Sequence, residues 1–207
     1  MIKNIVFDMG KVLLDYECDA AIRAFTKDEK LIKKISMAVF LSQEWVLLDM
    51  GIISEEQGLS RMLAHLDTEE EKEIAEKAFK NWHRYNLFPK AGMGELVKEL
   101  KEKHGYNCYI LSNASVRVPE CCYDIIPGHE YMSGALFSAN EKCIKPQDII
   151  YERFFKKFDL RPEECFFIDD LYENILGAEK TGMKGYCFSD GDIGKLREIL
   201  CNLRCRY

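Results

Sequence analysis

IKNIVFD, residues 2–8, is a run of mostly β-branched or apolar residues that stops at Asp8 and is followed by Met9 and Gly10. A buried parallel strand that meets a loop has this pattern. We therefore expect Asp8 at the carboxyl end of a strand in the protein interior.

Further short apolar runs predict strands at residues 106–111, 165–168 and 184–188. Each follows a stretch of helical periodicity, such as the crossover helix expected at residues 93–104. This alternation is typical of a parallel sheet with right-handed crossovers. The predicted fold class is α/β, with a Rossmann-like parallel sheet core.

Residues 16–85 follow a different pattern, with no strand candidate and several helix signals. Ser54 with Gln57, and Thr68 with Glu71, have capping-box spacing ahead of amphipathic runs. We expect an inserted helical cap domain at residues 16–85 and an α/β core domain made of residues 1–15 and 86–207. One helical face is expected to pack in the core, through Ile74, Ala75, Ala78, Phe79 and Trp82.

The composition indicates a globular protein that acts on a small molecule. The chain has 207 residues, 47% hydrophobic and 31% charged, and its net charge of −6 comes without a Lys/Arg block, which disfavours nucleic acid and anionic membranes as partners. Without a leader pattern or an apolar run of roughly 18 residues, we expect a cytoplasmic protein. The nine cysteines suit reduced thiols better than disulfides. The sequence indicates no oligomeric state.

Polar side chains gather at the predicted strand ends, where ligands bind in doubly wound sheets. They are Asp8 after the first strand, Ser112 and Asn113 after the second, Asp169 and Asp170 after the third, and Lys145 in a polar loop that opens a helix. Carboxylates, a hydroxyl and an ammonium suit phosphoryl transfer by a carboxylate nucleophile with a divalent cation. Each feature alone is common turn or cap chemistry, but their joint order favours an active site.

The stretches FDMGKVLLD, LSNAS, KPQDIIYERF and FFIDDLYENILGAEKTGMKGYCF resemble, in order, the four motifs of the haloacid dehalogenase (HAD) superfamily. The chain is most similar to the phosphatase branch with a small helical cap after the first motif. The resemblance covers residues 1–14 and about 86–190 by motif, and the cap by position and helicity. It implies a phosphoric monoester hydrolase that acts on a small phosphorylated metabolite.

The resemblance also implies roles for residues of the motifs. Asp8 would form an aspartyl-phosphate, and Ser112 and Lys145 would bind the phosphoryl oxygens. Asn113 matches a position that often contacts substrate. Asn174 matches a supporting polar position, with a helix N-cap as an equally good interpretation.

A magnesium ion is the implied cofactor. Its ligands would be Asp8, the backbone carbonyl of Gly10, and Asp170. Asp169 would then orient Lys145 or a metal-bound water.

Gly10 departs from the family pattern, in which most phosphatases carry a second Asp two positions after the nucleophile. That Asp protonates the leaving oxygen and then deprotonates water, and glycine does neither. Because a general acid or base contributes about 10²–10⁴ in rate, substrates with acidic leaving groups should suffer least. Some short-cap members with a similar Asp-x-Gly motif resemble sugar 1-phosphate phosphatases, so we favour an anomeric sugar phosphate.

Lys11 is a second departure, because small or uncharged polar residues are commoner at this position of the motif. Its ammonium either lies in an exposed loop or faces the substrate and strengthens phosphate binding.

Three other functions compete with the phosphatase. A 2-haloacid dehalogenase needs no acid for a halide leaving group, but it needs no Mg²⁺ and would leave Asp169 and Asp170 unexplained. A mutase depends on the missing acid/base. A degenerate, non-catalytic HAD domain would not need to retain nucleophile, hydroxyl, lysine and acidic pair.

Overall fold

The computed structural model describes residues 1–203, and its centre is a five-stranded parallel sheet in the order β5-β4-β1-β6-β7. The prediction of an α/β fold with a Rossmann-like parallel sheet is confirmed. The strands of this sheet are β1 (Asn4–Phe7), β4 (Asn107–Ser112), β5 (Met132–Phe137), β6 (Cys165–Asp169) and β7 (Lys184–Cys187).

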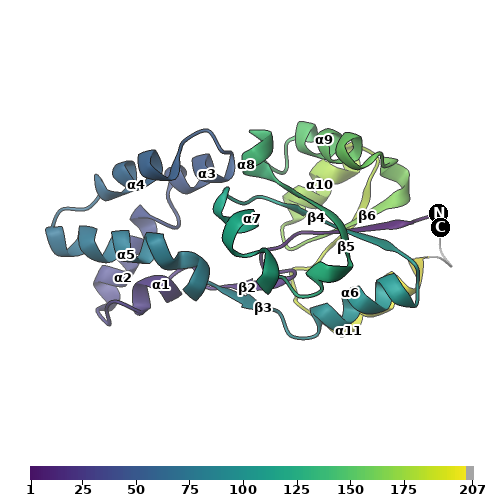
Figure 1. Ribbon diagram of the computed structural model, residues 1–207, viewed down its shortest axis with the longest axis horizontal. Helices are drawn as coiled ribbons and strands as arrows, with labels where there is room; N and C mark the ends of the chain where they lie inside the picture. The colour runs from purple at the N-terminus through teal and green to yellow at the C-terminus, as the bar shows by residue number, and fades with distance from the viewer. Residues whose placement is uncertain (204–207) are drawn as a thin grey trace.

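Helices cover both faces of the sheet (Figure 1). One face carries α6 (Met93–Glu102) and α11 (Ile193–Cys201), and the other carries α9 (Asp148–Phe158) and α10 (Tyr172–Lys180). Side chains along β1 alternate between the faces, because Ile5 and Phe7 join the core with α6 and α11 whereas Val6 joins the core with α9 and α10. Burial on both faces explains the continuous apolar run of β1.

Five helices between β2 (Leu14–Tyr16) and β3 (Leu87–Pro89) form a separate lobe, which we call the helical insertion. The antiparallel pair β2-β3 joins the helical insertion to the rest of the molecule (Figure 1). The helices are α1 (Ala20–Arg23), α2 (Glu29–Ala38), α3 (Gln43–Asp49), α4 (Glu55–Leu63) and α5 (Glu69–Tyr85).

Local sequence signals fix the ends of two of these helices. Ser54 and Thr68 form complete capping boxes with Gln57 and Glu71, as predicted. The predicted apolar face of α5 is buried, and in it Trp82 makes an edge-to-face contact with Trp45 of α3.

The segment between β4 and α9 differs from expectation. It contains α7 (Arg117–Cys121), α8 (Ser138–Glu141), the short 3₁₀ helices Tyr123–Ile125 and His129–Tyr131, and the unpredicted edge strand β5; a further 3₁₀ helix, Pro162–Glu164, precedes β6. The sequence of β5 does not predict a strand clearly, because the strand is only partly buried and contains Gly134. A side chain at Gly134 would overlap the ring of Phe158, so packing explains this glycine.

Other features agree with expectation or extend it. The β2-β3 ribbon was missed because each strand has only three residues. The cysteines among the described residues are free thiols. No helix within residues 1–203 is long and apolar enough to cross a membrane.

Candidate active site

Strand register brings three of the predicted residues to one edge of the sheet. Phe7 pairs with Ile110 of β4 on one side and with Ile168 of β6 on the other. Asp8, which follows Phe7, therefore lies between Ser112, the last residue of β4, and Asp169, the last residue of β6. All three side chains belong to buried residues, at the edge where α/β proteins bind ligands.

Lys145 joins these strand ends. Its ammonium donates to Oδ1 of Asp8 at 2.7 Å, to Oδ2 of Asp169 at 2.7 Å and to the carbonyl of Leu111 at 3.0 Å. The side chain of Lys145 is 1% exposed. One buried cation thus pairs with two buried carboxylates, and three acceptors fix its orientation.

Asn113 fixes the backbone of Lys145. Its side-chain amide donates to the Lys145 carbonyl at 3.0 Å, and its side-chain oxygen accepts from the Lys145 N–H at 2.8 Å. These contacts indicate that Asn113 positions the lysine, whatever contact it makes with substrate.

Asp169 has its oxygens engaged within the protein. Oδ1 accepts from the Leu171 N–H and from Asn174 Nδ2, each at 2.9 Å, and Oδ2 accepts from Lys145 and, at 3.0 Å, from Asn174. Asn174 is buried inside α10, whose N-cap is Leu171, so the N-cap interpretation of Asn174 is wrong. The contacts suit Asp169 to orienting Lys145.

A metal ion fits beside these residues. Carboxylate oxygens of Asp8, Asp169 and Asp170 all lie within 4.8 Å of one another. Because Asp169 is committed to hydrogen bonds, Asp8 and the half-buried Asp170 are the carboxylates left for a cation. Hard oxygen ligands at this spacing suit Mg²⁺.

The one ammonium and the two buried carboxylates of the cluster shift one another's pKa values. Burial raises the pKa of Asp8, Lys145 lowers it and Asp169 raises it again, to about 6. Burial lowers the pKa of Lys145, but Asp8 and Asp169 outweigh this effect and the pKa is raised overall. Near pH 7 the lysine is therefore an ammonium and Asp8 mainly a carboxylate, which is the form a nucleophile needs.

A cavity of about 250 Å³ opens over the cluster, and both lobes contribute to its walls. From the core come Asp8, Gly10, Ser112, Asn113, Lys145 and Asp170. The helical insertion and the β2 ribbon contribute Trp45, Asp49, Trp82 and Tyr16. Trp82 was predicted as a core residue, and it is both buried in the core and part of the cavity wall.

Lys11 lies at the rim of this cavity. It has a left-handed backbone (φ 58°), and its mostly exposed ammonium is 3.8 Å from Oδ2 of Asp170. Lys11 is thus an exposed lysine beside Asp170, and its contact with substrate stays a prediction.

Asp49 is a carboxylate residue of this cavity that sequence reasoning missed. It is the last residue of α3, far from any strand end, and strand ends were the signal that located the other residues. No motif marks it, because only the packing of the helical insertion against the core brings it to the site.

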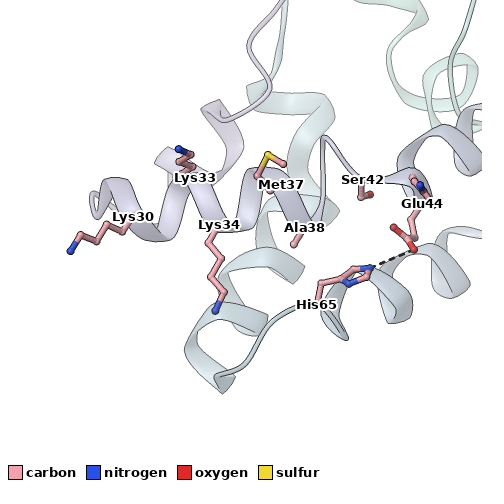
Figure 2. Close-up of a pocket in the computed structure, with 9 residues that line it drawn as sticks. Lys30, Lys33, Lys34, Met37, Ala38, Ser42, Glu44 and His65 are labelled. Atoms are coloured by element: carbon pink, nitrogen blue, oxygen red, sulfur yellow. Dashed lines mark ion pairs between the residues drawn. The ribbon is translucent and has the colours of Figure 1, made fainter.

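A larger concave surface of about 700 Å³ lies on the helical insertion (Figure 2). Lysines of α2 lie along one part of it, and His65 lies beside Glu44, at 3.6 Å, along another part. One of these lysines, Lys34, is paired with Asp67 and Glu71. It shares no residue with the Asp8 cavity, so we place the chemistry at Asp8.

Comparison with known proteins agrees with this geometry. A family model described as haloacid dehalogenase-like hydrolase matches residues 2–182. The chain belongs to this family. The resemblance found in the four sequence motifs is thereby confirmed, and the protein is a member of a hydrolase family.

A named phosphatase and two solved structures are similar to this HAD-like hydrolase over most of its length. A D-ribitol-5-phosphate phosphatase of Bacteroides thetaiotaomicron is 27% identical over 198 residues, which cover 90% of this chain and 91% of the relative. A predicted HAD-like family hydrolase from Porphyromonas gingivalis has a TM-score of 0.73 at 23% identity, over 97% of this chain and 98% of the other.

A HAD family enzyme from Bacteroides thetaiotaomicron, solved in complex with magnesium and inorganic phosphate, has a TM-score of 0.68 at 22% identity, over 90% and 93% of the two chains. These two structural likenesses show a shared fold.

Proposed function

We propose that this HAD-like hydrolase is a Mg²⁺-dependent phosphatase, a phosphoric monoester hydrolase that cleaves a small phosphorylated metabolite through an aspartyl-phosphate on Asp8. The observation that carries the proposal is the Lys145 ammonium, held 2.7 Å from Asp8 beside Ser112 and facing a cavity. An anionic nucleophile attacks an anionic ester only where positive charge is placed beside both.

Each polar group has a role in this reaction. Asp8 attacks phosphorus, while the Ser112 hydroxyl and the Lys145 ammonium bind phosphoryl oxygens. Asp169 keeps Lys145 in place. Lys11 adds positive charge at the rim.

The proposed Mg²⁺ ligands are Asp8, the carbonyl of Gly10 and Asp170. When bound, the metal supplies positive charge that offsets the charge of the phosphoryl group and the nucleophile. The magnesium and phosphate in the Bacteroides HAD enzyme support this assignment.

The substrate is small. The cavity of about 250 Å³ holds a metabolite but no folded phosphoprotein segment. The similarity to a D-ribitol-5-phosphate phosphatase supports a phosphorylated polyol or sugar. Preference for a sugar 1-phosphate rests on the missing acid at Gly10, and it holds only if no other residue supplies the proton.

We also propose that residues 16–85 act as a cap domain on a core of residues 1–15 and 86–207. The tryptophans of the helical insertion at the cavity wall support this role, because they shield the reacting groups from water. A 2-haloacid dehalogenase remains the alternative, although Asp170 beside Asp8 has no use in that reaction.

The test is a panel of phosphorylated sugars, polyols and aryl phosphates assayed with Mg²⁺ and with EDTA. We expect turnover with Mg²⁺, loss of turnover with EDTA, and a loss of at least about 10³-fold in Asp8→Asn. Acid quenching during turnover should yield a phosphorylated peptide that contains Asp8. Turnover of 2-haloacids in EDTA would establish the dehalogenase instead, and full turnover by Asp8→Asn would refute both.

A further inference from the structure

The proposed phosphatase lacks a proton donor at the position where its family provides one. Gly10 has no side chain, and a Cβ added there would meet no atom within 4 Å. The space beside the nucleophile is therefore open toward the cavity, and another element can supply a group to it.

Asp49 reaches this cavity from the opposite lobe. It is the last residue of α3 and lines the same cavity as Asp8, Gly10 and Ser112. Its contacts are made with the loop after β4 and with α8, since the Ser115 N–H donates to its carboxylate and the Ser138 hydroxyl donates to its backbone carbonyl.

The contacts around Asp49 form a rigid connection to the core. The Ser138 hydroxyl also accepts from the Ala114 N–H at 2.9 Å, which ties α3 to the loop that follows Ser112. Two residues after Asp49, Gly51 has φ +64°, and a side chain there would overlap the Ala139 carbonyl. The Ser115 N–H, which binds the side chain of Asp49, and the Ser138 hydroxyl, which binds its backbone carbonyl, thus hold Asp49 in place.

We infer that Asp49 is the general acid and base of this active site, in place of the aspartate that its family carries at the position of Gly10. The inference rests on the proposed phosphatase function.

The protonation behaviour of Asp49 is compatible with this role. Burial raises its pKa most, the Ser115 N–H lowers it and the charge of Asp8 raises it, to about 7. A carboxyl group with a pKa near the working pH can both give and take a proton. The other titratable or charged side chains on the cavity wall are Asp8, Lys11, Tyr16, Lys145 and Asp170.

The other groups on the cavity wall are unsuited to the task. Asp8 is the nucleophile and Asp170 a proposed metal ligand. Lys145 is held by two carboxylates, and Lys11 faces Asp170. Burial raises the pKa of Tyr16 far above neutrality, so it holds its proton.

Two proton transfers complete the reaction. In the first step an Asp8 oxygen bonds to phosphorus, the bond from phosphorus to the ester oxygen breaks, and that oxygen takes the proton of Asp49 to leave as an alcohol. In the second step Asp49, now a carboxylate, takes a proton from water as the water oxygen bonds to phosphorus. The bond from phosphorus to Asp8 breaks, which releases inorganic phosphate and restores both residues.

The first experiment compares wild type and Asp49→Asn on p-nitrophenyl phosphate and on a phosphate ester of a primary alcohol, with Mg²⁺. Nitrophenolate is stable enough to leave as an anion, whereas the oxygen of the primary alcohol must take a proton as it leaves. For the alkyl ester we expect kcat/KM of Asp49→Asn to fall by about 10²–10⁴-fold. For the aryl ester we expect a burst of about one nitrophenolate per enzyme and then slow turnover, because the second step lacks its base.

The pH profile gives a second readout. Wild-type kcat/KM for the alkyl ester should decline as pH rises above about 7, where Asp49 loses its proton. Asp49→Asn should lack this limb. Glu44→Gln, on the same helix α3 but outside the Asp8 cavity, should behave as wild type in both assays.

A restored donor separates proton transfer from shape. Gly10→Asp places a carboxyl in the open space beside Asp8, so Asp49→Asn/Gly10→Asp should regain at least tenfold of the lost activity on the alkyl ester. A double variant no better than Asp49→Asn would overturn the inference. So would wild-type activity of Asp49→Asn on both esters, and the phosphatase itself would then still stand. If wild type cleaves no ester, the proposed function fails first.

Discussion

Lys145 and Asp8 form a buried ion pair, with Nζ 2.7 Å from Oδ1, although 137 residues separate them in the chain. The same ammonium also donates to Oδ2 of Asp169 at 2.7 Å. Removal of the lysine would leave two buried carboxylates facing each other without a counter-charge, so stability and catalysis depend on one side chain.

Lys145→Met should therefore lower the free energy of unfolding by about 3–5 kcal/mol, the usual cost of breaking a buried pair, and abolish turnover. Urea denaturation at pH 7.5 measures the loss. Lys98→Met on the exposed side of α6 is the control and should change stability little. A Lys145→Met protein as stable as wild type would contradict the ion-pair argument.

Asn174→Ala should lower the free energy of unfolding by about 1.5–3 kcal/mol, because its amide donates to both oxygens of the buried Asp169 carboxylate. It should also reduce kcat, since Asp169 then holds Lys145 less firmly. Asn202→Ala removes only a local bond to the Glu198 carbonyl and serves as the reference. Equal effects of the two substitutions would argue against the orienting role.

Lys11→Asn should raise KM about threefold to tenfold with little change in kcat, because it removes a solvent-exposed charge at the rim of the cavity. Asparagine tolerates the left-handed backbone of this position better than alanine. Added salt should reduce the difference between wild type and variant. Lys33→Asn, on the concave surface of Figure 2, should leave KM unchanged.

Gly51→Ala should cost at least about 2 kcal/mol of stability, since the left-handed backbone and the Ala139 carbonyl both oppose a side chain. Gly191 has a similar φ of +66° but open space around it, so Gly191→Ala measures the backbone cost alone. Thermal unfolding of the two variants compares these costs. A loss no greater in Gly51→Ala would show that α3 can move away from α8.

Asp49→Asn should change the pH dependence of stability. The folded-state pKa of Asp49, about 7, lies above its ordinary value of 3.8, so wild type loses stability as pH rises through this window. Between pH 4 and 7 the free energy of unfolding of the variant should therefore rise relative to that of wild type, by at most about 1.4 kcal/mol per pH unit. Asp190→Asn should show little such trend in this range, because Lys195 holds the pKa of Asp190 below its ordinary value of 3.8 and any effect on stability appears only at lower pH. Urea titrations across this range measure both.

The hydrophobic pattern of the sequence was sufficient to predict the buried strands. A strand that is buried on both faces has a continuous apolar run, such as Ile5-Val6-Phe7. It missed β5, where partial burial and Gly134 weaken the pattern. The side chains at strand ends were predicted because the carboxyl ends of parallel strands lie at one edge of the sheet, where Asp8, Ser112 and Asp169 meet.

Asp49 could not be found in the same way. Its place depends on how α3 packs against the core, where Gly51 lies so close to Ala139 that a side chain would overlap the Ala139 carbonyl, and no local pattern encodes this contact. Asn174 was noticed at the right position, but its partners, the two oxygens of Asp169, became evident only from the packing of α10.

Lys11 has a further consequence for how a ligand arrives. The cavity over Asp8 adjoins a second hollow of about 580 Å³ that Lys90 and Asp190 also line, and the two share Lys11, Tyr16, Asp170 and Leu171 as walls. A phosphate ester that enters through this hollow passes the exposed ammonium of Lys11, which lies 3.8 Å from the carboxylate of Asp170. The molecule has a net charge of −6, which repels a dianion at long range. The ammonium of Lys11 places a local positive charge at the cavity, and this charge favours the approach of a phosphate dianion.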